Sequence, residues 1–295
     1  MQPADFLSAV FFYLKVGENL NQNWIVENLN NAFSTWNGKL GELWGLVTTG
    51  PQTFKGGAVW SVMQTLHNGM VGIGYALVVL FFAISLCKNT MNFHELKRPE
   101  AAINYLIRFV AAKALVGYGM DIMLNVFSIC NGIVTDMADS MGGISEAMVS
   151  LPAEMQTAIE NVGFLASIPL WLVTILGSLF ITVLSFVMIL TVYGRFFRLY
   201  MYTALAPLPL AAFAGESTQS VGISFLKSYV GVCLEGAVIV LACVIYSAFV
   251  GTPTVTGGEA TTIVWSYLAE TVFNMLVLVG LIKGSDRIIH EMMGL

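Results

Sequence analysis

Residues 168–193 read IPLWLVTILGSLFITVLSFVMILTVY, and none of these side chains is charged. An α-helix rises about 1.5 Å per residue, so this segment is long enough to cross the hydrocarbon core of a bilayer, which is about 30 Å thick. The sequence therefore predicts a transmembrane helix here.

The composition of the whole chain agrees with a membrane protein. Of its 295 residues, 57% are hydrophobic and 11% are charged, and the mean hydropathy is +0.77. These values exclude an ordinary soluble domain. The net charge of −5 and the absence of a basic run argue against direct nucleic-acid binding.

The predicted fold is an all-α polytopic membrane protein with about five transmembrane helices. Residues 61–295 form one helical bundle, and a separate amphipathic region, residues 1–60, precedes it outside the cytoplasm. The five spans are predicted at residues 66–87, 101–133, 168–193, 228–250 and 263–282.

The N-terminal region contains one helix with a single apolar face. Its apolar residues recur at steps of three and four, which is the spacing of a helical seam. This helix can lie in the membrane interface with its tryptophans at headgroup depth, pack on a partner subunit, or pack against its own bundle. The seam consists of Val26, Leu29, Phe33, Trp36, Leu40, Leu43 and Val47.

A second apolar segment, residues 199–214, is interrupted by Pro207 and Pro209 and followed by Gly215. Proline has no backbone N–H and pushes the residue before it out of the α conformation, so residues 204–210 are not expected to form a continuous α-helix. The segment is a re-entrant element, a proline-kinked helix or an interfacial loop. Irregular backbone at membrane depth has to be buried in protein or line a cavity.

The positions of the cations predict an orientation. Arg195, Arg198 and Lys227 surround the proline segment, further cations follow the first span and the last, and the acidic stretch 135–167 contains no Lys or Arg. Because cytoplasmic loops are enriched in Lys and Arg, we expect a cytoplasmic-membrane protein with its N-terminus outside and its C-terminus inside. If residues 199–214 crossed the membrane completely, Lys227 would lie outside, so this segment is expected to return to the cytoplasmic side.

Four of the charges within the predicted spans match in depth. Arg108 and Glu235 both lie roughly 10 Å from the cytoplasmic edge, and Lys113 and Glu270 roughly 20 Å from it. Charges inside a membrane are costly unless they are paired. We expect Arg108 to pair with Glu235 and Lys113 with Glu270, within one chain or between chains. Such pairs lock a bundle together or line a path for water.

No cofactor, metal site or enzymatic activity is predicted. The four cysteines lie in or beside apolar runs without CxxC spacing. His290 and Glu291 begin like the zinc motif HExxH, but residue 294 is glycine. Motifs for a P-loop, a nucleophile elbow or dinucleotide binding are absent from the sequence.

Several motifs in residues 169–249 resemble the TrbL-type polytopic inner-membrane subunit of type IV secretion and conjugation systems. The uncharged span ends in YGRFFR at residues 193–198, APLP follows at residues 206–209, and a long helix is expected over residues 217–249. KRPE at residues 97–100, before the second span, agrees with this resemblance.

The resemblance implies a non-catalytic channel or scaffold subunit that forms oligomers and helps DNA or protein cross the cytoplasmic membrane. Its partners would be the lipid bilayer, other channel subunits and the energising ATPases, approached by the elements around Arg195, Arg198 and Lys227. Contact with DNA or relaxase cargo would be indirect. The alternative is a small secondary transporter with its site at the broken segment, although the sequence shows no inverted repeat.

Overall fold

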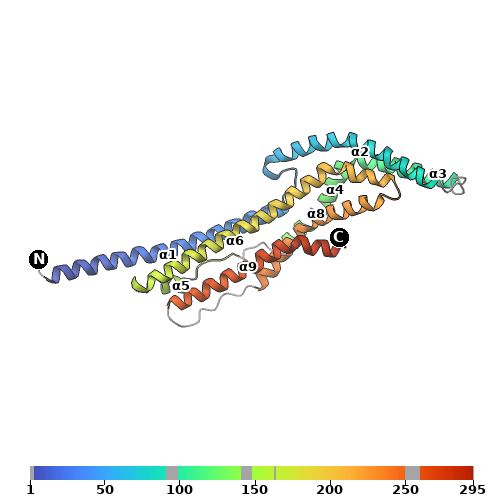
Figure 1. The fold of residues 1–295 in the computed structure, drawn as a ribbon. Coiled ribbons are helices and arrows are strands. Elements are labelled where there is room, and N and C mark those ends of the chain that lie inside the picture. Colours follow the sequence, from blue (N-terminus) through green and yellow to red (C-terminus); the bar gives the residue numbers. More distant parts are fainter. Residues whose placement is uncertain (1–2, 91–98, 141–147, 163, 250–259, 295) are drawn as a thin grey trace. The chain divides into compact units, whose positions relative to one another are not determined.

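The computed structural model describes residues 3–90, 99–140, 148–162, 164–249 and 260–294, and all regular secondary structure in these ranges is helical. Figure 1 shows the course of the chain through these helices. The helices are α1 (Pro3–Thr48), η1 (Phe54–Gly57), α2 (Ala58–Thr90), α3 (Pro99–Gly117), α4 (Gly119–Ser140), α5 (Ala153–Glu160), α6 (Phe164–Leu205), α7 (Pro207–Ala211), η3 (Ala212–Ala214), α8 (Gln219–Phe249) and α9 (Ala260–Met293).

Four described helices, α2, α6, α8 and α9, are long and apolar enough to cross a membrane, and α3 with α4 makes a fifth candidate if that bent pair is one span. The all-α polytopic fold class is therefore confirmed. The helices are longer than the spans that hydropathy predicts. At about 1.5 Å per residue, the 42 residues of α6 extend about 63 Å, roughly twice the hydrocarbon thickness.

The second predicted span, residues 101–133, is not one straight helix. The chain bends by 72° between α3 and α4, at Tyr118. Gly117 and Gly119 flank the bend, and glycine is among the residues that favour a helix interior least. A Cβ atom at Gly119 would also lie only 3.2 Å from Cδ1 of Leu210, so a glycine here allows α7 to approach closely.

The helix is interrupted at the proline segment as the sequence predicts, but Ala206, directly before Pro207, keeps α-helical backbone angles (φ −48°, ψ −40°), so the expected departure from the α conformation at this residue is wrong. α6 ends at Leu205, and the five-residue α7 begins at Pro207, where proline fits the first turn of a helix. One turn of 3-10 helix follows as η3, and the backbone becomes extended at Gly215. Residues 204–210 therefore do not form a continuous α-helix.

The chain divides into two compact units, and each is described by itself. Unit 1 comprises Met1–Gly45, Gly142–Thr191 and Leu241–Lys283. In unit 1 most of the α1 seam is buried rather than exposed at an interface: Leu29, Trp36 and Leu40 are completely inaccessible, whereas Val26 is half-buried. The aromatic rings of Phe33 on α1 and Tyr267 on α9 meet edge to face with 6.4 Å between their centres. The structure thus favours packing of α1 within its own chain, and Trp36 does not lie at an exposed headgroup position.

Unit 2 comprises Leu46–Met141, Val192–Val240 and Gly284–Leu295. Its core gathers side chains from α2, α3, α4, α6, α7 and α8, and includes the buried residues Val78, Val116, Met123, Leu199, Leu210 and Val232. The hydroxyl of Tyr229 on α8 donates to the carbonyl of Met123 on α4 at 2.7 Å, which adds a polar tie to this apolar core. Unit 2 contains the proline segment and both arginines that follow the long span.

Candidate functional site

Arg195 on α6 is a completely buried arginine in unit 2. Its guanidinium donates to three backbone carbonyls, those of Val232 at 3.3 Å, Cys233 at 3.2 Å and Val47 at 3.4 Å. Val47 lies in the last turn of α1, where carbonyls lack helical partners and a positive charge is favoured. Arg195 therefore joins the end of α1 to the middle of α8.

Gly236 provides the space in which this guanidinium lies. A Cβ atom at residue 236 would stand 2.8 Å from both Nη1 and Nη2 of Arg195, and 2.9 Å from its Cζ. Non-bonded heavy atoms attract best at about 3.5–4.0 Å, so any side chain here would displace the guanidinium. The guanidinium of Arg195 can therefore lie here only because residue 236 has no side chain.

Arg198, one turn further along α6, binds two carboxylates. Its Nη2 lies 2.6 Å from Oε2 and 2.7 Å from Oε1 of Glu235 on α8, and its Nη1 donates to Oδ1 of Asp286 on α9. The hydroxyl of Ser285 also donates to Oε1 of Glu235 at 3.2 Å. Glu235 is 1% exposed. One arginine therefore holds α6, α8 and α9 together.

These two arginines and their partners form what we call the arginine cluster: Arg195, Arg198, Glu235, Ser285, Asp286 and the carbonyls that Arg195 binds. Buried ion pairs contribute little net stability, but removing one partner leaves an uncompensated charge and is strongly destabilising. The cluster thus fixes which helices adjoin. Among the residues that the structure describes, no group of three or more His, Cys, Asp and Glu side chains could hold a metal ion.

The proline segment packs tightly against α2 and α3. A Cβ atom at Gly74 on α2 would lie 2.9 Å from the carbonyl oxygen of Pro207 and 2.9 Å from Cγ1 of Val116 on α3. A Cβ atom at Gly215, after η3, would lie 3.1 Å from the carbonyl oxygen of Phe81 on α2. Close approach of backbone to backbone fills the space around the break.

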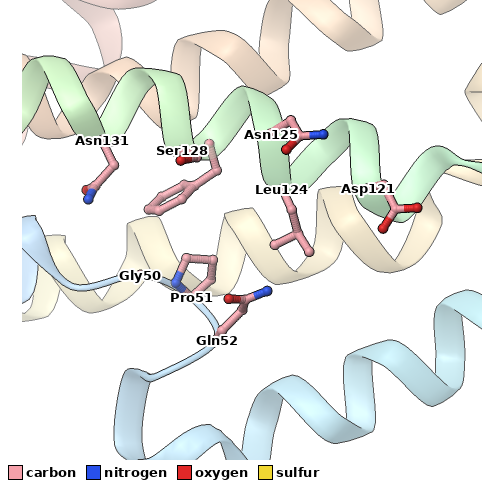
Figure 2. A pocket seen from close by; sticks show the side chains of 9 residues that line it. Gly50, Pro51, Gln52, Asp121, Leu124, Asn125, Ser128 and Asn131 are labelled. Carbon is pink, nitrogen blue, oxygen red and sulfur yellow. The ribbon is translucent and has the colours of Figure 1, made fainter.

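A pocket of about 520 Å³, lined by both polar and apolar side chains, lies elsewhere in unit 2, between α4 and the loop that follows α1. Figure 2 shows polar side chains of α4 on one side of it and Gln52 on the other. The amide of Asn131 donates to the carbonyl of Thr48 at 3.2 Å, which ties the end of α1 to α4, whereas its Oδ1 atom is buried without a hydrogen bond. The other polar lining residues are Asp121, Asn125 and Ser128.

Residues 36–207 match the model of the TrbL/VirB6 plasmid conjugal transfer like protein family. The match covers more than half of the chain. This protein belongs to that family. The matched segment begins inside α1 and ends at the first proline of the broken segment. Searches of curated proteins and of solved structures found no match.

In this TrbL/VirB6-like chain, the family model matches residues 36–207, whereas the sequence motifs that suggested the resemblance lie mainly in residues 169–249. The matched segment reaches back over α1 to α4, and it includes YGRFFR and the start of APLP. The KRPE motif falls within it, although Lys97 and Arg98 lie outside the described residues. Family membership supports a conjugal transfer subunit with several membrane-spanning helices.

The predicted pairing of Arg108 with Glu235 is wrong within one chain. Glu235 binds Arg198, and Arg108 lies 3.5 Å from Glu216, just beyond the proline segment, in a pair whose side chains are 40% and 61% exposed. Depth along a helix does not specify which face of the helix a side chain occupies. Matching depths therefore did not identify the partner of either residue, because Arg108 lies beside Glu216 in the turn before α8 and Glu235 binds Arg198 on α6.

The second predicted pair, Lys113 with Glu270, stays a prediction. Lys113 belongs to unit 2 and Glu270 to unit 1, and both side chains are exposed. An exposed charge within an apolar helix needs water or an oppositely charged neighbour.

The expectation that the elements around Arg195, Arg198 and Lys227 approach other subunits stays a prediction, and the structure shows what these side chains bind within the chain. Arg195 is fully buried, and the guanidinium of Arg198 binds Glu235 and Asp286, so neither guanidinium is a free docking group. Lys227 is exposed on α8, and its role in contacting another subunit stays a prediction.

Sequence reasoning missed Gly236, Ser285 and Asp286 as members of the cluster. Gly236 directly follows Glu235, the one acidic residue of α8, and a glycine beside a buried charge can indicate close approach of another chain segment. Asp286 was visible only as one charge in a charged tail. Its distance from Arg198 in the sequence, 88 residues, hid the pair.

Proposed function

We propose that this protein is a structural channel or scaffold subunit of a conjugative type IV secretion apparatus, and that it helps DNA or protein cross the cytoplasmic membrane. The observation that carries the proposal, beside family membership, is the arginine cluster. Its charges bind one another and the backbone, which suits a part that holds helices in place rather than one that binds a passing solute.

The packing of the proline segment supports a structural role over that of a small transporter. A transporter site at this break would need space for its substrate beside the irregular backbone. Pro207, Leu210 and Ala211 are buried, and Gly74 lies against Pro207. The broken segment therefore serves as a packed core element.

Large apolar side chains on the described helices face outward and provide surfaces for lipid and for other subunits. Examples are Val79 on α2, 57% exposed, Leu172 on α6, 57% exposed, and Leu190 on α6, 69% exposed. Exposed apolar area of this extent on a membrane protein is covered by acyl chains or by neighbouring helices. We propose that the partners include further copies of this chain, other channel subunits and the energising ATPases.

We propose that the N-terminus lies outside the cytoplasm and the C-terminus inside, with Lys227 on the cytoplasmic side. The distribution of cations supports this orientation. The small negative net charge also supports only indirect contact with DNA or relaxase cargo, because binding to phosphates needs Lys and Arg side chains.

Conjugation by a donor strain that lacks this gene tests the proposal, with complementation by the wild-type gene, by Glu235→Gln and by Glu291→Gln. Deletion should abolish transfer and the wild type should restore it. Glu235→Gln should restore little, because Glu235 is buried against Arg198. Glu291→Gln should restore transfer, since the carboxylate of Glu291 is 65% exposed and binds only at the surface.

Immunoblots of membrane fractions show whether each variant accumulates, and affinity purification of the wild-type protein should recover other transfer subunits. Undiminished transfer after deletion would contradict the proposal. Ligand-dependent uptake by the purified protein in liposomes would favour the transporter instead.

A further inference from the structure

The carbonyl of Thr203 loses its helical hydrogen-bond donor because of Pro207. In an α-helix each carbonyl accepts from the N–H four residues later, and residue 207 is a proline without an N–H. Thr203 is 3% exposed, so water does not readily replace the missing donor. A buried backbone carbonyl left without a partner destabilises the folded state, so this carbonyl needs another partner.

His67 on α2 supplies that partner. Its Nδ1 lies 2.7 Å from the carbonyl oxygen of Thr203, and its side chain is 2% exposed. A carbonyl oxygen can only accept, so Nδ1 carries the hydrogen and donates it. The hydroxyl of Thr203 donates elsewhere, to the carbonyl of Leu199 at 2.8 Å.

We propose that His67 is the positioning residue of the helix break, replacing from α2 the backbone N–H that Pro207 lacks. The bond between His67 and Thr203 holds the end of α6 against α2, so that α7 starts at a fixed place. The proline alone would leave the direction of the chain after Leu205 less defined.

The same imidazole lies beside the second helix break. A Cβ atom at Gly119, at the bend between α3 and α4, would be 3.5 Å from Cε1 of His67 and 3.2 Å from Cδ1 of Leu210 on α7. Gly74, two turns along α2 from His67, meets Pro207 and Val116. The two breaks therefore pack together on one face of α2, and His67 provides the directional bond that holds the first of them, at the end of α6.

A double-mutant cycle tests this proposal, because Pro207→Ala returns an N–H to residue 207. His67→Gln places its amide nitrogen near the position of Nε2, too far along the side chain to reach Thr203, whereas His67→Asn places an amide nitrogen near the position of Nδ1. Pro209→Ala is the matched control, because it returns a donor to the carbonyl of Leu205 instead. The readout is the unfolding equilibrium of the full-length protein in mixed detergent micelles.

In the wild-type background, His67→Gln should raise the unfolding constant about tenfold or more, and His67→Asn should recover most of that loss. In the Pro207→Ala background His67→Gln should have a markedly smaller effect, and in the Pro209→Ala background the full effect should remain. If His67→Gln alone does not fold, Pro207→Ala should restore folding. The proposal is overturned if His67→Gln has the same effect in every background, or if Pro207→Ala does not restore a non-folding variant. Since folding is the quantity measured, this outcome is independent of the role in conjugation.

Discussion

Replacing Gly236 by alanine should destabilise this protein, although alanine favours helices more than glycine does. The new methyl group would occupy the position 2.8 Å from both terminal nitrogens of Arg195. The guanidinium would have to leave the carbonyls of Val232 and Cys233, and it has no access to water there.

The magnitude follows from two opposing effects. Disrupting the partners of a buried charge costs about 3–5 kcal/mol. Alanine in place of glycine in a helix interior stabilises by about 1 kcal/mol. The expected net destabilisation is about 2–4 kcal/mol, which raises the unfolding constant roughly 30-fold to 1,000-fold.

Gly194→Ala is the matched control. Gly194 adjoins Arg195 in the same helix, and a Cβ atom there would meet nothing within 4 Å. This variant should be as stable as the wild type or more stable by up to about 1 kcal/mol. The assay is equilibrium unfolding of each purified protein in mixed micelles, followed by far-ultraviolet circular dichroism. Equal stability of Gly236→Ala and Gly194→Ala would refute the inference that Gly236 makes room for a fixed arginine.

Three further outcomes are expected. Glu235→Gln should destabilise unit 2 by about 3–5 kcal/mol in the same unfolding assay. Asp286→Asn should destabilise it by less, because the Asp286 carboxylate is 43% exposed. Equal losses of stability would mean that burial does not decide the cost of removing a carboxylate. Gly74→Ala should lower the stability by about 1–3 kcal/mol, because its Cβ would press on the backbone of Pro207. Gly72→Ala is the control and should not lower the stability, because a Cβ there would meet nothing within 4 Å. A stable Gly74→Ala variant would show that α2 and α7 can separate without cost. Lys227→Cys should resist an impermeant thiol reagent added to intact cells that already lack the other accessible cysteines, and should react after the cells are opened; labelling of intact cells would reverse the proposed orientation.

The long apolar runs made the helices and the fold class predictable from sequence. Hydropathy reports whether a segment can cross a bilayer, and the two prolines indicate where a helix must stop. Both signals are local. They located α2, α6, α8 and α9 and the break after Leu205 without any knowledge of packing.

The partners of the charges were not predictable in the same way. Arg198 stands 37 residues from Glu235 and 88 residues from Asp286. Whether these side chains meet depends on helix rotation and on which helices are neighbours, and depth along a span determines neither. The bend at Tyr118 was missed for a related reason, because two glycines lower the preference for a helix without specifying a 72° turn.

The arginine cluster also has a consequence for the order in which the protein matures. α6 leaves the ribosome with Arg195 and Arg198 before any of the α8 and α9 groups that bind them have been synthesised. An arginine at the centre of a bilayer costs about 2.5–3.5 kcal/mol on insertion scales, so in the nascent chain both side chains stay hydrated or among lipid headgroups. The C-terminal end of α6 can lose that hydration and reach its final position only after residues 232–235, and then residues 285–286, have been translated.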